Sequence, residues 1–109
     1  MKFLVLAMLI GTITGESVQA QTGNSFIAMC ADSNQAAHCT TYITGFVHGL
    51  WSADMINKNQ IRICFQAGVT SLQVQSIVEK FMRENPELLH LQADILIVTA
   101  LERAFPCSR

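Results

Sequence analysis

Four cysteines in a short chain constrain its fold more than any other feature of the sequence. They lie at Cys30, Cys39, Cys64 and Cys107. An even number of cysteines in a short exported protein is typical of a disulfide framework, so we expect two disulfides. A tetrahedral zinc site is the alternative, but the sequence has no C-x-x-C pair and no paired Cys/His spacing. Four cysteines allow three pairings, and the sequence does not choose among them.

The first twenty residues predict export. Lys2 supplies a positive start, residues 3–10 form an unbroken apolar run, and Val18-Gln19-Ala20 places small residues at the −3 and −1 positions of a cleavage site. This order is typical of a secretory signal peptide. The apolar run is far shorter than the roughly 20 residues that a membrane-spanning helix needs. We therefore expect a signal peptide over residues 1–20, a mature domain over residues 21–109 in the periplasm, and no membrane attachment after cleavage.

The charge balance argues against one class of partner. The chain has 7 basic and 8 acidic residues, a formal net charge of −1, one Trp, one Tyr and no basic cluster. Proteins that bind nucleic acids present a basic patch or stripe, so we expect no nucleic-acid partner. The length allows a single mature domain, and a core of this size is commonly reinforced by disulfides.

Apolar residues recur at helical spacing in four stretches of the mature domain. The stretches run from about Ser25 to Cys30, Gln35 to Met55, Thr70 to Asn85 and Leu91 to Ala104. We therefore predict an all-α fold, in which one short and three longer helices form a small bundle stapled by disulfides.

Helix-capping signals mark where two of these helices begin. Asn24 or Ser25 can cap the first helix. Thr70 and Gln73 have the spacing of a capping box, in which the N-cap side chain and the third helical residue satisfy each other's backbone N–H groups. Residues 61–65 alternate between apolar and polar or small side chains and are predicted to be a short extended connector.

A row of small residues follows one side of the second helix: Thr41, Gly45, Gly49 and Ser52. An interior glycine destabilises a helix by about 1 kcal/mol relative to alanine, so some other contact should compensate. We favour close packing of another helix of the same domain on this row. Contact with a second chain is the alternative.

The fourth helix is apolar on two sides. One face contains Ala93, Leu96, Ile97, Ala100, Leu101 and Ala104, and a second stripe contains Leu91, Ile95, Val98 and Glu102. A helix with two apolar sides is either central in its domain or meets another subunit. The second stripe therefore predicts a homodimer, and the row at Gly45 and Gly49 is the competing dimer surface.

The sequence offers no catalytic set and no cofactor signature. His38 precedes Cys39 directly, but neighbouring helical residues point apart, and a sulfur in a disulfide is not a nucleophile. His48 and Asp54 are spaced so that they lie on different faces of a helix. The motifs H-E-x-x-H and G-x-S-x-G and a phosphate-binding loop are absent from the sequence. We therefore expect a binding protein without a cofactor rather than an enzyme.

Several motifs in order along the mature chain resemble the Rap/Tai immunity proteins of type VI secretion systems. The matching segments are Cys39-x-x-Tyr42-Ile43-x-Gly45-x-x-x-Gly49, Ile63-Cys64, Gly68-Val69-Thr70 with Gln73, Phe81 to Leu88 with Asn85-Pro86-Glu87-Leu88, Ala100-Leu101, and Ala104-Phe105-Pro106-Cys107. One departure is Gln66, where the family commonly has a proline after the third cysteine.

The resemblance implies a small periplasmic helical bundle that binds a secreted peptidoglycan amidase and blocks its active site. It also implies that the chain acts stoichiometrically, and several such proteins are homodimers. A periplasmic acid-stress chaperone and a structural envelope protein are the alternative functions, since both can be small, helical and disulfide-bonded.

Two exposed loops are the predicted contacts with this effector, because loops on a rigid scaffold commonly carry function. One is the polar loop between the second helix and the connector. The other is a turn fixed by Pro86. The candidate residues are Asn57, Lys58, Asn59, Gln60, Glu87 and His90.

Overall fold

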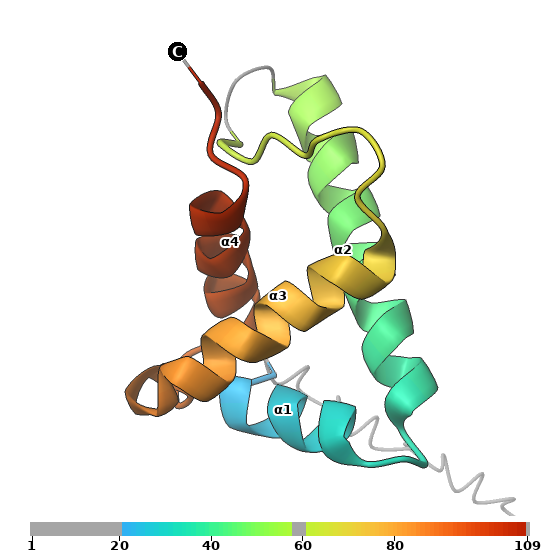
Figure 1. Ribbon diagram of the computed structural model, residues 1–109, viewed down its shortest axis with the longest axis vertical. Coiled ribbons are helices and arrows are strands. Elements are labelled where there is room, and N and C mark those ends of the chain that lie inside the picture. The colour runs from blue at the N-terminus through green and yellow to red at the C-terminus, as the bar shows by residue number, and fades with distance from the viewer. Residues whose placement is uncertain (1–20, 58–60, 109) are drawn as a thin grey trace, which may run out of the picture.

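The computed structural model describes residues 21–57 and 61–108 and shows the predicted all-α fold (Figure 1). Its elements in chain order are α1 (Gly23–Ala31), α2 (Ala36–Ile56), α3 (Ser71–Glu84), a short 3₁₀ helix η1 (Pro86–Leu88) and α4 (Ala93–Ala104). The predicted signal peptide, residues 1–20, lies outside the described residues. No helix in the described part of the chain is long and apolar enough to cross a membrane.

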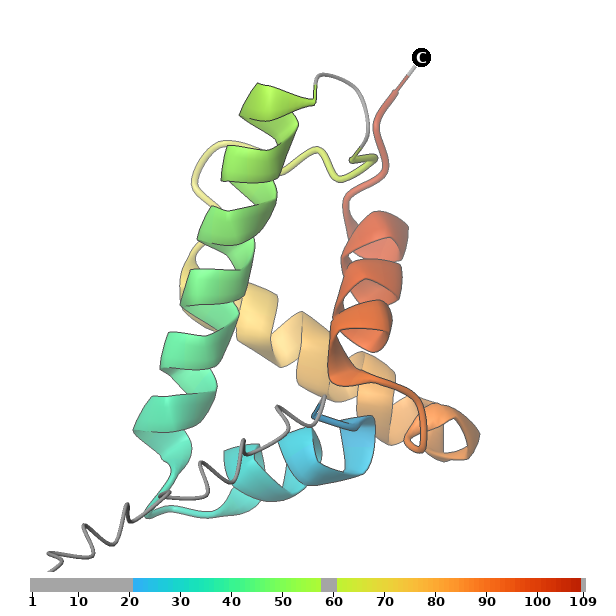
Figure 2. The same cartoon turned by 180° about the vertical axis from the view of Figure 1, so that it is seen from behind.

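The helix α3 lies across the other helices and closes the bundle. In Figure 1, α3 crosses in front, with α1 below it and α2 and α4 upright on either side, and Figure 2 shows the same arrangement from behind. The main packing pairs are α3 with α4, α1 with α2 and α2 with α3. All four α-helices contribute to one buried core of Phe26, Cys39, Ile43, Val47, Val74, Val78, Met82, Ala93, Leu96, Ile97, Ala100 and Leu101.

The first helix begins earlier than the sequence predicted. Its N-cap is Thr22, whose hydroxyl accepts a hydrogen bond from the Ser25 backbone N–H, while Ser25 Oγ accepts one from the Thr22 backbone N–H. The prediction that Asn24 or Ser25 caps the helix is therefore wrong. The added turn depends on Gly23, because a Cβ there would lie 2.5 Å from Leu96 Cδ1 and 3.1 Å from the Leu89 Cα atom.

The fourth helix begins at Ala93, two residues later than predicted. The residues before it are extended because their backbone pairs with the backbone of residues 21–23. Gly23 N donates to Leu91 O at 2.9 Å, and Ala93 N donates to Gln21 O at 2.7 Å. The segment joins the beginning of α1 to the beginning of α4, so backbone pairing takes the place of the predicted first turn.

The third helix follows its sequence signals closely. Thr70 Oγ1 accepts from Gln73 N, and Gln73 Oε1 accepts from Thr70 N, which completes the predicted capping box. Val74, Val78 and Met82 are buried along one side. Two ion pairs with i,i+4 spacing form on another side of the helix, between Arg83 and Glu79 at 3.2 Å and between Lys80 and Glu84 at 3.9 Å.

Two disulfides resolve the pairing that the sequence left open. Cys30 is bonded to Cys39, which joins the end of α1 to the start of α2, and Cys64 is bonded to Cys107, which joins the connector to the C-terminal tail. The first bridge is short in sequence, with a separation of 9 residues, and the second has a separation of 43. The expectation of two disulfides is confirmed.

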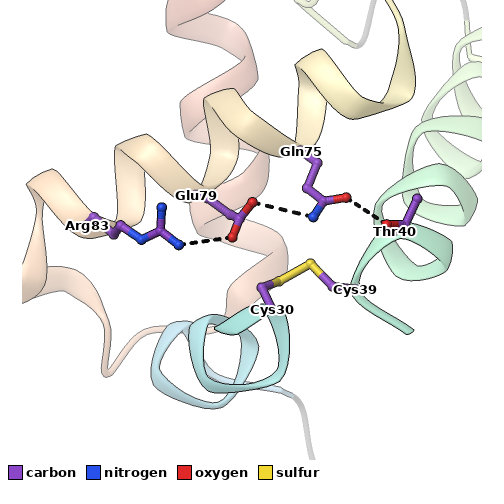
Figure 3. A network of polar contacts seen from close by, with 6 residues as sticks. All are labelled: Cys30, Cys39, Thr40, Gln75, Glu79 and Arg83. Atoms are coloured by element: carbon purple, nitrogen blue, oxygen red, sulfur yellow. Dashed lines mark hydrogen bonds and ion pairs between the residues drawn. A yellow bond between two sulfur atoms is a disulfide. The ribbon is translucent and has the colours of Figure 1, made fainter. Parts of the chain in front are cut away.

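A chain of polar contacts lies beside the first disulfide and ties α2 to α3 (Figure 3). Thr40 Oγ1 donates to Gln75 Oε1 at 2.9 Å, and Gln75 Nε2 donates to Glu79 Oε2 at 3.4 Å. Arg83 Nη2 donates to the other oxygen of Glu79. The disulfide, the polar chain and the core therefore fix the same end of the bundle.

Candidate interaction surface

The last two turns of α2 carry large apolar side chains that the fold does not bury. Ile43 is fully buried and Val47 nearly so, but the exposed fractions then rise to 53% for Trp51, 77% for Met55 and 80% for Ile56. Large exposed apolar side chains grouped on one element are a common mark of a protein-interaction site. We call Trp51, Met55 and Ile56 the α2 tip.

A cleft of about 290 Å³ opens beside Trp51. Its apolar wall comes from Val47, Trp51, Phe65 and Val74, and its other wall is the turn of residues 66–71. The Trp51 and Phe65 rings meet edge to face with centroids 6.1 Å apart, and the His48 ring stacks on Trp51 at 5.4 Å. These contacts hold the tryptophan in place while leaving half of its surface open, as an anchor at a protein interface requires.

The turn opposite Trp51 requires a glycine. Gly68 has φ of +89°, a backbone conformation that side-chain-bearing residues rarely adopt. The turn brings the chain from the connector to the capping box of α3, with Val69 packed on the core. Backbone geometry at Gly68 and the helix cap at Thr70 therefore set the course of the chain along this side of the cleft.

The helix α2 carries little charge. Within Ala36–Ile56 there is no Lys or Arg, one carboxylate, Asp54, and the two histidines His38 and His48. By contrast, the exposed side of α3 carries two ion pairs. The α2 tip is thus suited to a partner that contributes apolar side chains rather than a strongly charged patch.

The two predicted contact loops lie far apart. Asn57 is exposed directly after the α2 tip, and Lys58, Asn59 and Gln60 lie outside the described residues. Glu87, in η1, and His90, two residues beyond it, are also exposed. Figure 1 places the end of α2 and the η1 turn at opposite ends of the described part of the chain, so the fold does not bring Asn57 together with Glu87 and His90.

The predicted dimer stripe is shorter than the sequence suggested. Leu91 precedes α4 and packs on the core, so it does not continue the stripe along the helix. Ile95 is 51% exposed, Val98 is half-buried and Glu102 is exposed. Ile95 and Val98 form a shallow groove of about 310 Å³ with Phe46 of α2.

One titratable group lies on the α2 side of this region. Burial, with a smaller contribution from the Asp94 carboxylate, raises the pKa of the Tyr42 hydroxyl. The hydroxyl is therefore neutral near physiological pH, and the Tyr42 ring packs against Phe26 with centroids 5.5 Å apart.

The row of small residues on α2 is not packed against another helix of the chain. Thr41, Gly45, Gly49 and Ser52 are all exposed, and a Cβ added at either glycine would meet nothing within 4 Å. The expectation that a helix of the same domain covers this row is therefore wrong. The burial stripe of α2 faces the opposite direction, and α3 and α1 both pack on that stripe.

Sequence reasoning missed the α2 tip as a surface. The apolar spacing of the second predicted helix continues through Trp51, so the spacing alone does not separate the exposed Trp51 from the buried Ile43 and Val47. A signal was present in the sequence, since Met55 and Ile56 stand directly before the polar residues 57–60. They extend the apolar residues of α2 beyond the part of the helix that the shorter helices α1, α3 and α4 cover. Among the described residues, no group of three or more His, Cys, Asp or Glu side chains is arranged to hold a metal ion.

Comparison with known proteins identifies one match. A family model described as Rap1a immunity proteins matches residues 22–107, which is nearly all of the described chain. No curated protein and no solved structure matches the sequence. The matched segment begins at the N-cap of α1 and ends at Cys107, so it spans α1 to α4 and the two disulfides of the described residues.

Proposed function

The chain belongs to the Rap1a immunity protein family, and from that premise we propose that it binds and inhibits a secreted peptidoglycan amidase in the periplasm. Members of this family protect against a secreted effector and are generally not catalysts. The family match over residues 22–107 is the observation that carries the proposal. An inhibitor of this kind acts stoichiometrically, so one binding event neutralises one effector.

The α2 tip and its cleft are the surface that we propose for the effector contact. Protection against leaked effector calls for affinity at nanomolar concentration or below, which corresponds to about −12 kcal/mol or better. A few buried anchors surrounded by near-neutral contacts usually supply such affinity, and tryptophan is prominent among them. Trp51 is half-exposed, held by Phe65 and His48, and followed by two apolar residues and the loop at Asn57.

The function is tested by co-expression with a periplasm-directed amidase encoded beside the gene. Cells that make the exported protein should survive, and cells that make a version confined to the cytoplasm, starting at Gln21, should lyse. Equal protection by both versions would contradict the periplasmic site of action. If neither version protects and no complex forms in a pull-down, the immunity function is wrong, and acid-stress chaperone activity is the next function to measure.

The contact surface is tested by a matched pair of exposed apolar residues. Trp51→Ala should weaken the complex at least about 30-fold, because truncation of an anchor commonly removes 2 kcal/mol or more. Leu72→Ala is the control, since Leu72 is 65% exposed and lies on α3, where it is the second residue, rather than on the α2 tip. Equal affinity of the two variants would show that the effector does not bind at the α2 tip.

We also propose that the protein is a homodimer through Ile95, Val98 and Glu102 of α4. The half-exposed Ile95 and the groove shared with Phe46 support this surface. Val98→Glu would bury an unpaired charge there and should convert a dimer to a monomer in light scattering. If Val98→Glu is folded and still dimeric, the dimer interface lies on another surface. If the parent protein is a monomer, the homodimer proposal is wrong.

A further inference from the structure

The two disulfides differ in their access to solvent. Cys39 is fully buried in the core, and Cys30 is partly buried and packs against that core. Cys64 and Cys107 are both exposed. Exchange requires a thiolate to reach a sulfur atom of the bridge, so access to the bridge controls its rate. On this ground, the bridge between the connector and the tail is far more open to a thiol than the bridge between α1 and α2.

A cavity of about 290 Å³ leads to the exposed bridge. It is lined by Arg62, Glu102, Pro106 and Cys107. Along the connector, Arg62 and Cys64 are exposed while Ile61, Ile63 and Phe65 are partly buried, and this alternation places Arg62 and Cys64 on the same side. An incoming thiolate can therefore approach Cys107 through the cavity, and the departing Cys64 sulfur lies on the same side of the connector as a guanidinium group.

The exposed bridge holds the connector and the C-terminal tail together through contacts that lie outside the helical core. Cys64 N donates to Phe105 O at 2.9 Å, and the Phe65 and Phe105 rings pack with centroids 5.0 Å apart. Phe65 in turn packs against Trp51 and forms a wall of its cleft. Neither Cys64 nor Cys107 belongs to the buried core that α1 to α4 share. Opening this bridge therefore loosens the connector and the tail beside Trp51 without removing a core side chain.

We infer that the Cys64–Cys107 disulfide is a thiol-exchange site for a dithiol reductant, while the Cys30–Cys39 disulfide is a permanent structural bond. One thiolate of the dithiol attacks Cys107 Sγ, the Cys64–Cys107 bond breaks, and its electron pair leaves on the Cys64 thiolate, which takes up a proton. The second thiol of the dithiol then attacks the mixed disulfide and expels Cys107 as a thiolate. Both cysteines are reduced and the dithiol becomes a disulfide, with two electrons transferred. The inference is independent of the proposed immunity function.

The test uses protein exported as the full chain and purified from the periplasm. It is treated with one mild concentration of dithiothreitol for increasing times, thiols are trapped by alkylation at each time, and the modified cysteines are mapped by mass spectrometry. Cys64 and Cys107 should be fully alkylated before any alkylation of Cys30 or Cys39 is detected. Trp51 is the single tryptophan, so its emission should shift in step with the first reduction. The helical circular dichroism signal should stay unchanged at that stage.

Two double variants control the experiment. In Cys64→Ser/Cys107→Ser, the emission should already have the shifted value and should not respond to mild dithiol treatment, whereas Cys30→Ser/Cys39→Ser should keep the response. If a variant does not fold, the order of alkylation in the parent protein decides alone. Alkylation of all four cysteines together with loss of the helical signal, or of Cys30 and Cys39 first, would overturn the inference.

Discussion

The two ends of α2 lie in different surroundings although their sequences look alike. From Cys39 to Val47 the apolar residues face α1 and α3, a disulfide closes the end, and a polar chain runs alongside it (Figure 3). From Trp51 to Ile56 the apolar residues face solvent beside an exposed disulfide. We call these the closed end and the open end. Because α2 is longer than the helices packed against it, its last apolar side chains stay outside the core. These side chains are accessible to a partner.

The largest expected effect comes from the bridge at the open end. The chain-entropy model gives about 4 kcal/mol for a loop the size of Cys64–Cys107 and about 2.6 kcal/mol for Cys30–Cys39. Cys64→Ser/Cys107→Ser should therefore lower the free energy of unfolding by about 4 kcal/mol, measured by chemical denaturation, even though both residues are exposed. A loss well below 2 kcal/mol would show that exposure, rather than loop length, decides the contribution of this bridge.

The next effect compares two isoleucines of the same helix. Ile43→Ala at the closed end should lower the free energy of unfolding by roughly 3 kcal/mol, because it leaves a cavity in the core. Ile56→Ala at the open end should change it by less than about 0.5 kcal/mol, because its side chain is 80% exposed. Similar losses for the two variants in denaturant titrations would mean that Ile56 is covered in the free protein.

Two glycines sharpen the same contrast. Gly23→Ala should destabilise the fold by about 1–3 kcal/mol, since its Cβ would collide with Leu96 and the Leu89 backbone. Gly45→Ala should stabilise it by about 1 kcal/mol, because alanine is the better helix former and the added Cβ has open space. Thermal unfolding of both variants shows whether each change raises or lowers the stability of the fold. A destabilising Gly45→Ala would show that something packs on the row of small residues.

A small loss of stability is expected at the cap beside the cleft. Thr70→Ala removes the oxygen that accepts from Gln73 N and should lower the free energy of unfolding by about 1 kcal/mol. Thr70→Ser keeps the oxygen and serves as the control. The measurement is the denaturation midpoint of the two variants and the parent. An unchanged midpoint for Thr70→Ala would show that the cap does not contribute to stability.

Local signals predicted the helices well where the local chemistry decides the structure. The capping box at Thr70 and Gln73 and the stripe from Val74 to Met82 were both readable, because each depends on residues within a few positions of one another. The start of α1 was misplaced although its cap, Thr22 with Ser25, is local, and the close packing that favours Gly23 there involves Leu89 and Leu96, which are distant in sequence. Backbone pairing with Gln21 likewise delayed the start of α4.

The candidate site was harder to predict because exposure is a property of the whole fold. Periodicity places Trp51 in line with the buried Val47, and only the arrangement of α1, α3 and α4 shows that no helix reaches it. The disulfide pairing was undetermined for the same reason. The loops at Asn57 and Glu87 remain predictions, and the structure adds the apolar α2 tip beside the first of them.

The central claim is that the open end of α2 binds an effector stoichiometrically through apolar side chains that the core does not bury. The most direct measurement is the residual peptidoglycan cleavage by the amidase that we propose as the effector, as the protein is added in increasing molar ratio. We predict a straight decline to zero at one binding site per effector, with Trp51→Ala far weaker and Leu72→Ala like the parent. Undiminished cleavage at equimolar protein, or complete loss at a small fraction of it, would contradict the account.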